Sequence, residues 1–214
     1  MAVSEIGRED QMQLYNSIGP NPKLVRMFMA EKGIEVPQVW VDLMKMENRQ
    51  GDYLKVNPHG QCPALELDDG QVICEVTVIC EYLEDTHPKP ALIGSNPKEK
   101  AEARMWTRRI DLNICEPMAN GFRFGEGLEM FKDRIVCVPE AADGLKRIAQ
   151  NRLSWLDKQM DGKTWIVGER LTLADLLLFA WVNAFKDRNQ PLPADANNLH
   201  GWFERMAARP SAEA

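Results

Sequence analysis

The sequence predicts an α/β N-terminal half followed by an all-helical C-terminal half, and three observations support this fold class. Strand-like and helix-like hydrophobic patterns alternate as far as Leu83. A proline-rich connector follows, from His87-Pro88-Lys89-Pro90 to Gly94-Ser95-Asn96-Pro97. Beyond it the pattern has the period of helices, without a convincing strand. We therefore expect an α/β domain at 12–87, a linker at 88–96 and a helical domain at 97–214.

The elements of the first half follow from local signals. Apolar alternation predicts strands, a shared apolar face predicts helices, and a glycine after the last periodic residue marks a helix end. Asp68-Asp69-Gly70 between two apolar runs is a strong hairpin signal. In chain order, these signals predict a strand at Gln13–Tyr15, a helix holding Leu24, Met27 and Phe28 that Gly33 ends, a strand at Gln38–Asp42, a short helix holding Tyr53 and Leu54, strands at Ala64–Leu67 and Gln71–Cys74, and a helix holding Val76, Ile79, Cys80 and Leu83. This order implies a mixed sheet with helices packed on it.

The second half is predicted to be helical throughout. A helix that starts at Pro97 could run to about Asn113, after which Pro117 and the glycines that follow it bend or break the pattern. Thr172-Leu173-Ala174-Asp175 resembles a capping box with Asp in place of Glu, and the run it opens is apolar on all sides, as in a fully buried helix. The remaining predictions are a helix at about 140–160 with the buried stripe Leu145, Ile148, Leu153 and Leu156, and a last helix holding Trp202, Phe203 and Met206.

Composition and charge narrow the function classes. Of 214 residues, 44% are apolar, which suffices for a sizeable core, and 26 basic against 32 acidic side chains give a net charge of −6. A nucleic-acid binder should show a basic stripe, but the densest basic stretch, Arg104–Arg109, is followed by Asp111 and is interpreted as a solvated helix face. No apolar run has the length of a membrane span, and residues 1–11 lack the apolar middle of a secretory signal. We therefore expect a cytosolic protein.

The cysteines point away from a metal site. The five of them, at positions 62, 74, 80, 115 and 137, show neither CxxC spacing nor a Cys/His cluster. A zinc site is not expected, and no metal is assigned. In a reducing compartment these residues are expected to be free thiols, most of them packed in the core.

Three local motifs resemble the cytosolic glutathione transferase superfamily. The segment Asn57–Leu65 is similar to the family's NPxGxVPxL stretch, Glu75–Leu83 to its ESxAIxxYL helix start, and Gly168–Asp175 to the capping segment of its second domain. The resemblance implies a thioredoxin-like N-terminal domain, an all-α second domain and a homodimer. It also implies glutathione as co-substrate and a small electrophilic or disulfide substrate, with neither nucleic acid nor membrane as partner. The same fold hosts non-catalytic members.

The resemblance also implies where glutathione binds. A cis peptide bond before Pro63 would turn the main chain of Cys62 outward, to pair with the cysteinyl unit of glutathione like an added strand. Gln61 would contact the glycyl end, with His59 and Arg49 as weaker candidates. The alternative interpretation of Pro63 is an ordinary trans turn proline.

The γ-glutamyl end is expected at a helix N-terminus. The resemblance places Glu75 and Val76 there, where free amides attract a carboxylate. Glu75 would face the ligand's amino group, or would merely be a favourable acid at the helix start. Val76 stands where the family has Ser or Thr, and the lost hydroxyl predicts weaker glutathione binding by about 1 kcal/mol.

A transferase must stabilise the glutathione thiolate, because a free thiol has a pKa of about 8.5. The family uses Tyr, Ser or Cys just after the first strand. Here Pro20-Asn21 is similar to the Thr-Pro-Asn stretch of Nu-class enzymes, with Gly19 in place of Thr. Asn21 is the first candidate, as a hydrogen-bond donor to sulfur, and Ser17 and Tyr15 follow. The alternative for Asn21 is a turn residue before a helix whose first turn holds Pro22.

The co-substrate would lie between the two domains. Geometry alone suggests Met105, Trp106, Arg109 and Asn113 at the start of the helical domain, together with Phe122, and core or interface packing is the alternative. Cys62 is either a packing residue or a redox partner of glutathione. The leading hypothesis is a glutathione transferase, with disulfide reductase or peroxidase activity as a variant. The alternative from another class is a non-catalytic binding or regulatory protein with this fold.

Overall fold

The computed structural model describes residues 12–214, so the secretory-signal prediction, which concerns residues 1–11, lies outside the described residues. The elements predicted for the first half are present. They are β1 (Gln13–Asn16), α1 (Pro20–Lys32), β2 (Gln38–Trp40), the 3₁₀ turn η1 (Glu47–Arg49), α2 (Gly51–Val56), β3 (Ala64–Glu66), β4 (Val72–Ile73) and α3 (Val76–Thr86).

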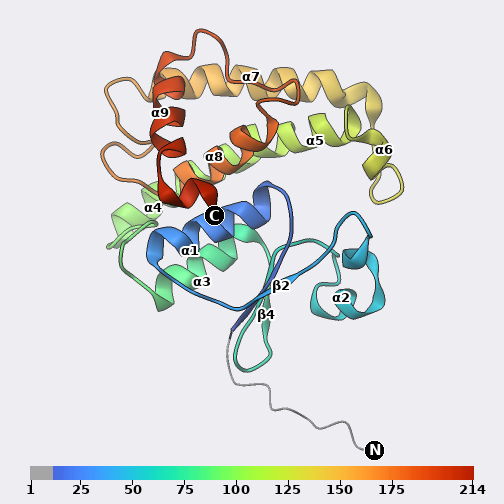
Figure 1. Cartoon of the computed structure of the whole chain (residues 1–214). Coiled ribbons are helices and arrows are strands. Elements are labelled where there is room, and N and C mark those ends of the chain that lie inside the picture. Colours follow the sequence, from blue (N-terminus) through green and yellow to red (C-terminus); the bar gives the residue numbers. More distant parts are fainter. Residues whose placement is uncertain (1–11) are drawn as a thin grey trace, which may run out of the picture.

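Within the described chain, the strands form one mixed sheet in the order β2-β1-β3-β4. β1 runs parallel to β2 and antiparallel to β3, so that Tyr15 lies beside both Val39 and Ala64. β3 and β4 form the predicted hairpin, whose turn ends at Gly70 with a φ of 83° that suits glycine. Helices α1 and α3 lie on one side of the strands and α2 on the other (Figure 1).

The second half is helical, as predicted. Its elements are α4 (Pro97–Ile110), the π-helical turn η2 (Asp111–Cys115), α5 (Glu116–Phe124), α6 (Leu128–Phe131), η3 (Pro139–Ala141), α7 (Ala142–Gln159), α8 (Leu173–Phe185), α9 (Asn197–Ala207) and η4 (Pro210–Glu213). In the described part of the chain, no helix combines the length and the apolar character that crossing a bilayer requires.

The helix that starts at Pro97 is longer than predicted. It continues through η2 into α5, and Figure 1 shows α4 and α5 as one run. Pro117 does not break it, because the chain widens into a π turn just before the proline. The amide of Glu116 there bonds to the carbonyl of Asp111, five residues back. The wider turn accommodates a residue that lacks its own N–H.

The burial predicted for Ile148, in the apolar stripe of α7, is wrong. Ile148 is 49% exposed, whereas Ala149, Leu153 and Leu156 are fully buried. Those three lie four and three residues apart on one face, and Ile148 is rotated by about 100° from Ala149. The buried face therefore runs through Leu153 and Leu156 as predicted, but through Ala149 in place of Ile148, and Leu145 is half-buried.

Helix α8 forms the centre of the helical half and is buried on all sides, as predicted. The Asp175 carboxylate accepts from the Thr172 amide at 2.9 Å, which is the carboxylate half of the predicted capping box. The same carboxylate accepts from the Ile166 amide at 2.9 Å and from the Trp202 indole at 3.0 Å. It therefore ties the start of α8 to the preceding loop and to α9.

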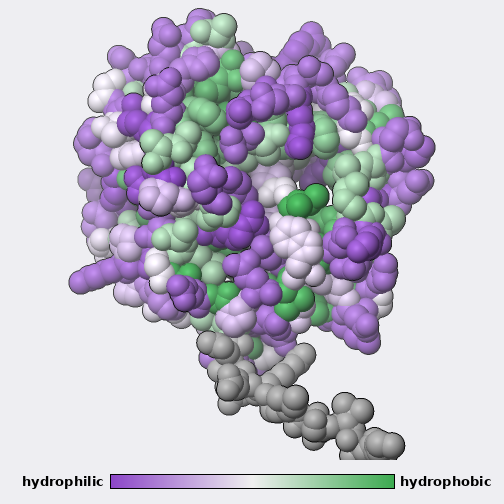
Figure 2. Space-filling model, viewed as in Figure 1, coloured by the Kyte–Doolittle hydropathy of each residue, from purple (hydrophilic) through white to green (hydrophobic). Residues whose placement is uncertain are grey.

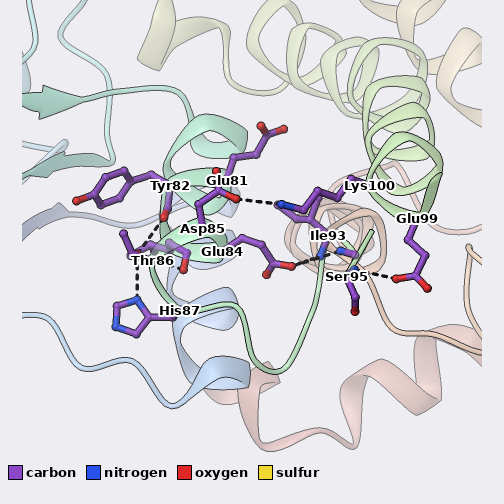
Figure 3. Close-up of polar contacts among 12 residues, drawn as sticks. Glu81, Tyr82, Glu84, Asp85, Thr86, His87, Ile93, Ser95, Glu99 and Lys100 are labelled. Carbon is purple, nitrogen blue, oxygen red and sulfur yellow. Dashed lines mark hydrogen bonds and ion pairs between the residues drawn. The ribbon is translucent and has the colours of Figure 1, made fainter. Parts of the chain in front are cut away.

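The segment between α3 and α4 is anchored by a buried ion pair. Lys32 Nζ lies 2.7 Å from Glu84 Oε2 and donates to the carbonyls of His87 at 2.6 Å and Pro90 at 2.7 Å. The Glu84 carboxylate in turn accepts from three amides of this segment, those of Leu92, Ile93 and Gly94. Figure 3 shows Glu84 reaching from α3 to Ile93.

The last turn of the chain packs against α1, and Figure 1 places the C-terminus beside that helix. Arg209 forms a two-pronged pair with Glu31, with both N–O distances 2.7 Å. At the other end of α1, Lys23 Nζ donates to the Ala212 carbonyl at 2.7 Å. Both ends of α1 are therefore held by residues from the far end of the sequence.

Candidate functional site

Three chain segments meet at one end of the sheet. β1 and β4 end there and β3 begins there, because β3 is antiparallel to both. The strand register thus brings together the loop after β1, the Cys62–Pro63 segment before β3 and the start of α3. Figure 2 shows this face of the molecule hollowed between the helical layer and the strands, with apolar side chains beside the opening.

The main chain of Cys62 is open at this end of the sheet. The bond between Cys62 and Pro63 is cis, as the resemblance implies. Among the described residues, no hydrogen bond engages the N–H or C=O of Cys62. The preceding carbonyl, that of Gln61, accepts from the Tyr53 hydroxyl at 2.6 Å and the Asn57 amide at 2.8 Å. A fixed segment thus presents the unpaired N–H and C=O of one residue, as strand addition requires.

The thiol of Cys62 is turned into packing. Its Sγ lies 3.1 Å from the Tyr53 hydroxyl, to which it donates. Burial raises the pKa of this thiol, and the tyrosine hydroxyl only partly opposes that rise. Because the thiolate is the reactive form of cysteine, the structure favours packing over redox chemistry for Cys62.

Asn21 lies inside the first turn of α1, and not in a turn before the helix. Gly19 precedes the helix with a φ of 107°, and Pro20 and Pro22 flank Asn21. Since proline has no N–H, Asn21 supplies an unbonded main-chain donor of this turn, besides its side-chain amide. Both donors lie at the positive end of the helix dipole, where an anion is stabilised.

The hydroxyl of Ser17 already has a hydrogen-bond partner. It is fully buried, and its hydroxyl donates to the Val41 carbonyl at 2.6 Å. A thiolate could receive this proton only if that bond broke, so the structure does not support Ser17 as a sulfur donor. Tyr15, the third candidate, donates its hydroxyl to Glu66 at 2.8 Å, which fits the strand position foreseen for it. Arg26 fixes the loop by donating to the Ser17 carbonyl at 3.1 Å.

Glu75 occupies a strained position just before α3. Its φ of 67° is in the left-handed region, which non-glycine residues rarely adopt. Residues that do adopt it are found more often at functional sites. The side chain is exposed, and the amide of half-buried Val76 has no intrahelical partner because it belongs to the first turn. An acid and free amides thus occur side by side, which matches a ligand end that carries both an amino group and a carboxylate.

Asp111 is a candidate that sequence reasoning missed. With Thr77 of α3 it lines a hollow of about 200 Å³ between α3 and α4. Burial raises the pKa of this carboxyl, Arg108 at 3.8 Å lowers it, and the charges of Glu116 and Glu75 raise it further. It therefore adds negative potential next to Glu75. The sequence offered no signal, because an acid after a basic stretch looks like a solvated helix face.

Arg49 and Gln61 lie on either side of Gly60. Arg49 is half-buried and donates to the His59 carbonyl at 3.2 Å, while its Nε is buried without a partner in the described chain. Gly60 has a φ of 61°, and a Cβ there would come within 2.7 Å of the Asn48 carbonyl. Gln61 has an exposed side chain. Gln61 therefore directly precedes Cys62 in the chain, and the Arg49 side chain lies beside Gly60, two positions before it.

The predicted co-substrate residues differ in how far they are buried. Trp106 is buried against Trp155 of α7, with ring centroids 5.9 Å apart, and Arg109 stacks on it at 5.1 Å. The structure thus favours the packing alternative for Trp106, while the exposed Arg109 covers the Trp106 ring. Met105 and Asn113 are exposed, and the Asn113 amide donates to the Arg109 carbonyl at 2.8 Å. Between residues 12 and 214, no group of three His, Cys, Asp or Glu residues is arranged to hold a metal ion.

Comparisons with known proteins match both halves of the chain. A family model for the glutathione S-transferase N-terminal domain matches residues 19–86, and one for the C-terminal domain matches residues 137–210. The chain is 30% identical to protein LigF of Sphingobium sp., over 94% of this chain and 91% of that protein. It is 28% identical to glutathione S-transferase 2 of Saccharomyces cerevisiae, over 96% and 89%. A solved structure of a glutathione S-transferase domain-containing protein from Marinobacter aquaeolei VT8 has a TM-score of 0.84 at 32% identity, covering 93% of this chain and 98% of that one.

Proposed function

The chain belongs to the cytosolic glutathione transferase superfamily, and we propose that it binds glutathione at the end of the sheet and uses it as a nucleophile. The family membership confirms the predicted fold class, a thioredoxin-like domain followed by a helical one. Relatives named as glutathione S-transferases support an enzyme over a non-catalytic binding protein. Glutathione is the co-substrate and an electrophile or a disulfide is the second substrate.

The observation that carries the proposal is the unpaired main-chain N–H and C=O of Cys62. The cysteinyl unit of glutathione has one N–H and one C=O, and it can exchange two hydrogen bonds with these groups as an added strand does. The tripeptide then extends in two directions. Its γ-glutamyl end reaches the amide of Val76 and the carboxylates of Glu75 and Asp111, and its glycyl end reaches Gln61 and Arg49.

Thiolate stabilisation is assigned to the first turn of α1. The thiol loses its proton to solvent, and the sulfur accepts hydrogen bonds from the main-chain N–H and side-chain amide of Asn21. Hydrogen bonds to a charged group are worth about 1.5–3 kcal/mol each, so one such bond lowers a thiol pKa by about 1–2 units. The thiolate attacks the electrophilic carbon and forms a C–S bond, while the leaving group departs with the electrons of the bond that breaks. With a disulfide substrate, the thiolate attacks one of the two sulfurs and forms an S–S bond with it, while the substrate's own S–S bond breaks and the other sulfur leaves as a thiolate.

The assembly and location belong to the same proposal. We propose a homodimer in the cytosol, as is typical of the family. Three large apolar side chains remain exposed on α3, α4 and η2 and suit a partner surface, namely Val78, Met105 and Leu112. Light scattering after size exclusion would test the dimer.

A ligand titration tests the function. Calorimetry should detect glutathione binding, and the ultraviolet absorbance of the thiolate should appear at a pH below the pKa of free glutathione. S-methylglutathione is the matched control, because it keeps the backbone and lacks the ionisable thiol. Turnover of 1-chloro-2,4-dinitrobenzene and of hydroxyethyl disulfide then separates the transferase from the disulfide reductase. If glutathione binds without thiolate formation and without turnover, the protein is a binding module and the proposal is wrong.

A further inference from the structure

Three arginines of the helical half are held over aromatic rings. Arg123 and Arg134 each place Cζ 5.8 Å from the centre of the Phe131 ring, and Arg188 lies 5.6 Å from that of Phe122. The Phe122 and Phe131 rings meet edge to face with centres 6.3 Å apart, so the three cations share one aromatic cluster. In the described chain, none of these arginines forms an ion pair.

Arg123 and Arg134 both lie against the Phe131 ring, so two positive charges flank one apolar group. Like charges repel, and a carboxylate beside them would relieve the repulsion. Two neighbouring acids are already engaged, Glu129 with Lys132 at 2.6 Å and Glu126 with Lys146 at 2.7 Å. The positive charges of the three arginines are therefore available to an anionic ligand.

A hollow of about 650 Å³ opens beside this cluster, after α6. Arg134 lines it together with apolar side chains that include Leu128, Ile135 and Val136, and Val136 is 87% exposed. Lys132 and Asp133 also line the hollow, and Lys132 forms its ion pair with Glu129. An apolar wall with a guanidinium beside it suits a ligand that has an apolar body and a carboxylate.

The hollow lies on the side from which a co-substrate would approach. Figure 1 shows α6 and its loop projecting from the end of α5, on the same side of the molecule as α2. Figure 2 shows the opening between the helical layer and the strands on this face. A molecule that reacts with a thiolate at the N-terminus of α1 can therefore extend towards α6.

We propose that Arg134, supported by Arg123, binds the carboxylate of the co-substrate, and that the acceptors of this enzyme are electrophiles with an apolar body and a carboxylate. Guanidinium and carboxylate pair through two parallel hydrogen bonds, which fixes orientation as well as adding affinity. The inference rests on the proposed function, because it assigns the second substrate of that reaction.

A pair of substrates that differ in charge tests the subsite. 4-Chloro-3,5-dinitrobenzoate carries a carboxylate, and 1-chloro-2,4-dinitrobenzene reacts with the same nucleophile without one. The selectivity is the ratio of kcat/KM for the anion to that for the neutral compound. We expect Arg134→Gln to lower this ratio about tenfold, Arg123→Gln to lower it less, and Arg134→Lys to restore part of it. Arg152→Gln is the matched control, because it removes an exposed arginine of α7 and should leave the ratio unchanged. An unchanged ratio in Arg134→Gln, or an equal fall in Arg152→Gln, overturns the proposal.

A binding measurement separates this proposal from the proposed function. If the protein turns over neither compound, the transferase proposal fails, and calorimetric titration with the chlorodinitrobenzoate decides the subsite. Binding that is about tenfold weaker in Arg134→Gln than in Arg152→Gln supports it. Equal binding to the two variants, or none to the unaltered protein, rejects it.

Discussion

Two polar regions of the N-terminal half differ in how completely their hydrogen bonds are satisfied. Around Lys32 and Glu84, both side chains are buried, and the lysine meets three acceptors while the carboxylate meets three amides. At the end of the sheet, the main-chain N–H and C=O of Cys62 and the donors of Asn21 have no partner in the described chain. Unpaired polar groups are costly unless water or a ligand satisfies them. The first region therefore holds the structure together, and the second leaves polar groups free for the ligand that we propose.

Breaking the satisfied region should give the largest effect. Lys32→Met leaves Glu84 as a buried charge without its partner, and we expect a loss of about 3–5 kcal/mol in the free energy of unfolding. Urea unfolding followed by fluorescence measures this. The double variant with Glu84→Gln should lose less than the sum of the single variants, because no unpaired charge remains.

The control for that prediction is an exposed pair. Lys55 and Asp52 lie 2.9 Å apart in solvent, and Lys55→Met should leave the urea midpoint unchanged. If Lys32→Met were as mild as Lys55→Met, the buried pair would not be what anchors the segment between α3 and α4.

A second satisfied cluster gives a pH-dependent effect. Burial raises the pKa of Asp175, against the opposing hydrogen bonds from Ile166, Thr172 and Trp202. A raised pKa means that the folded protein holds this proton more tightly than the unfolded chain does. Its contribution is therefore fully present below the unfolded pKa of about 3.9 and declines as the pH rises through the folded value.

The variant Asp175→Asn tests this sign. It places an amide NH₂ where the carboxylate accepted hydrogen bonds, so we expect a cost of about 1–3 kcal/mol. The advantage of the wild type should shrink between about pH 4 and neutrality, measured as the difference in Tm at each pH. An advantage that grew with pH would contradict the raised pKa.

The open region should respond in function more than in stability. Asn21→Ala removes a donor to the thiolate, and we expect the pKa of bound glutathione to rise by about one unit and kcat/KM to fall about 10–100-fold. Ultraviolet titration of the thiolate and steady-state kinetics measure these changes. Asn151→Ala on α7 is the matched control.

Ser17→Ala sharpens the same prediction. Its hydroxyl serves the Val41 carbonyl, so the variant should lose about 1 kcal/mol of stability and leave the thiol pKa unchanged. If Ser17→Ala moved the thiol pKa while Asn21→Ala did not, the assignment of the sulfur donor would be reversed.

The smallest effect is expected at the start of α3. Val76→Ser restores a hydroxyl at the carboxylate end of the site and should tighten glutathione binding by about 1 kcal/mol, or about fivefold. Calorimetry measures it, with Val78→Ser as the control, since Val78 is 50% exposed two residues further along. If the two variants bound glutathione with equal affinity, a hydroxyl at position 76 would not contribute to glutathione binding.

The fold was largely predictable because its signals are local. The hairpin at Asp69-Gly70 and the buried run of α8 follow from turn chemistry and periodicity, and the structure has both. The helix end predicted near Pro117 was wrong because a helix can accommodate a proline by widening into a π turn. Whether it does so depends on the packing around that turn. The burial predicted for Ile148 was wrong because the prediction followed the large apolar side chains, whereas the small residue Ala149 occupies the buried face.

The site was less predictable because much of it depends on contacts between distant residues. The sequence placed Cys62, Pro63 and Glu75 through motifs that are continuous in the chain. Whether Ser17 has a free hydroxyl depends on Val41, which lies beside it only after the sheet forms. The burial of Trp106 depends likewise on Trp155. The division into domains at 88–96 and the roles of individual site residues remain predictions.

The contact between η4 and α1 has a consequence for how the two halves depend on each other. Lys23 and Ala212 are 189 positions apart, and Arg209 reaches Glu31 across 178. During synthesis, the helix that carries Asn21 can therefore form these two contacts only after Arg209 and Ala212 have been added to the chain. A fragment that ends after α3 would keep the sheet but leave Glu31 without its arginine. Mixing such a fragment with the complementary helical piece is thus a natural way to ask whether the nucleophile site is assembled by the N-terminal half alone.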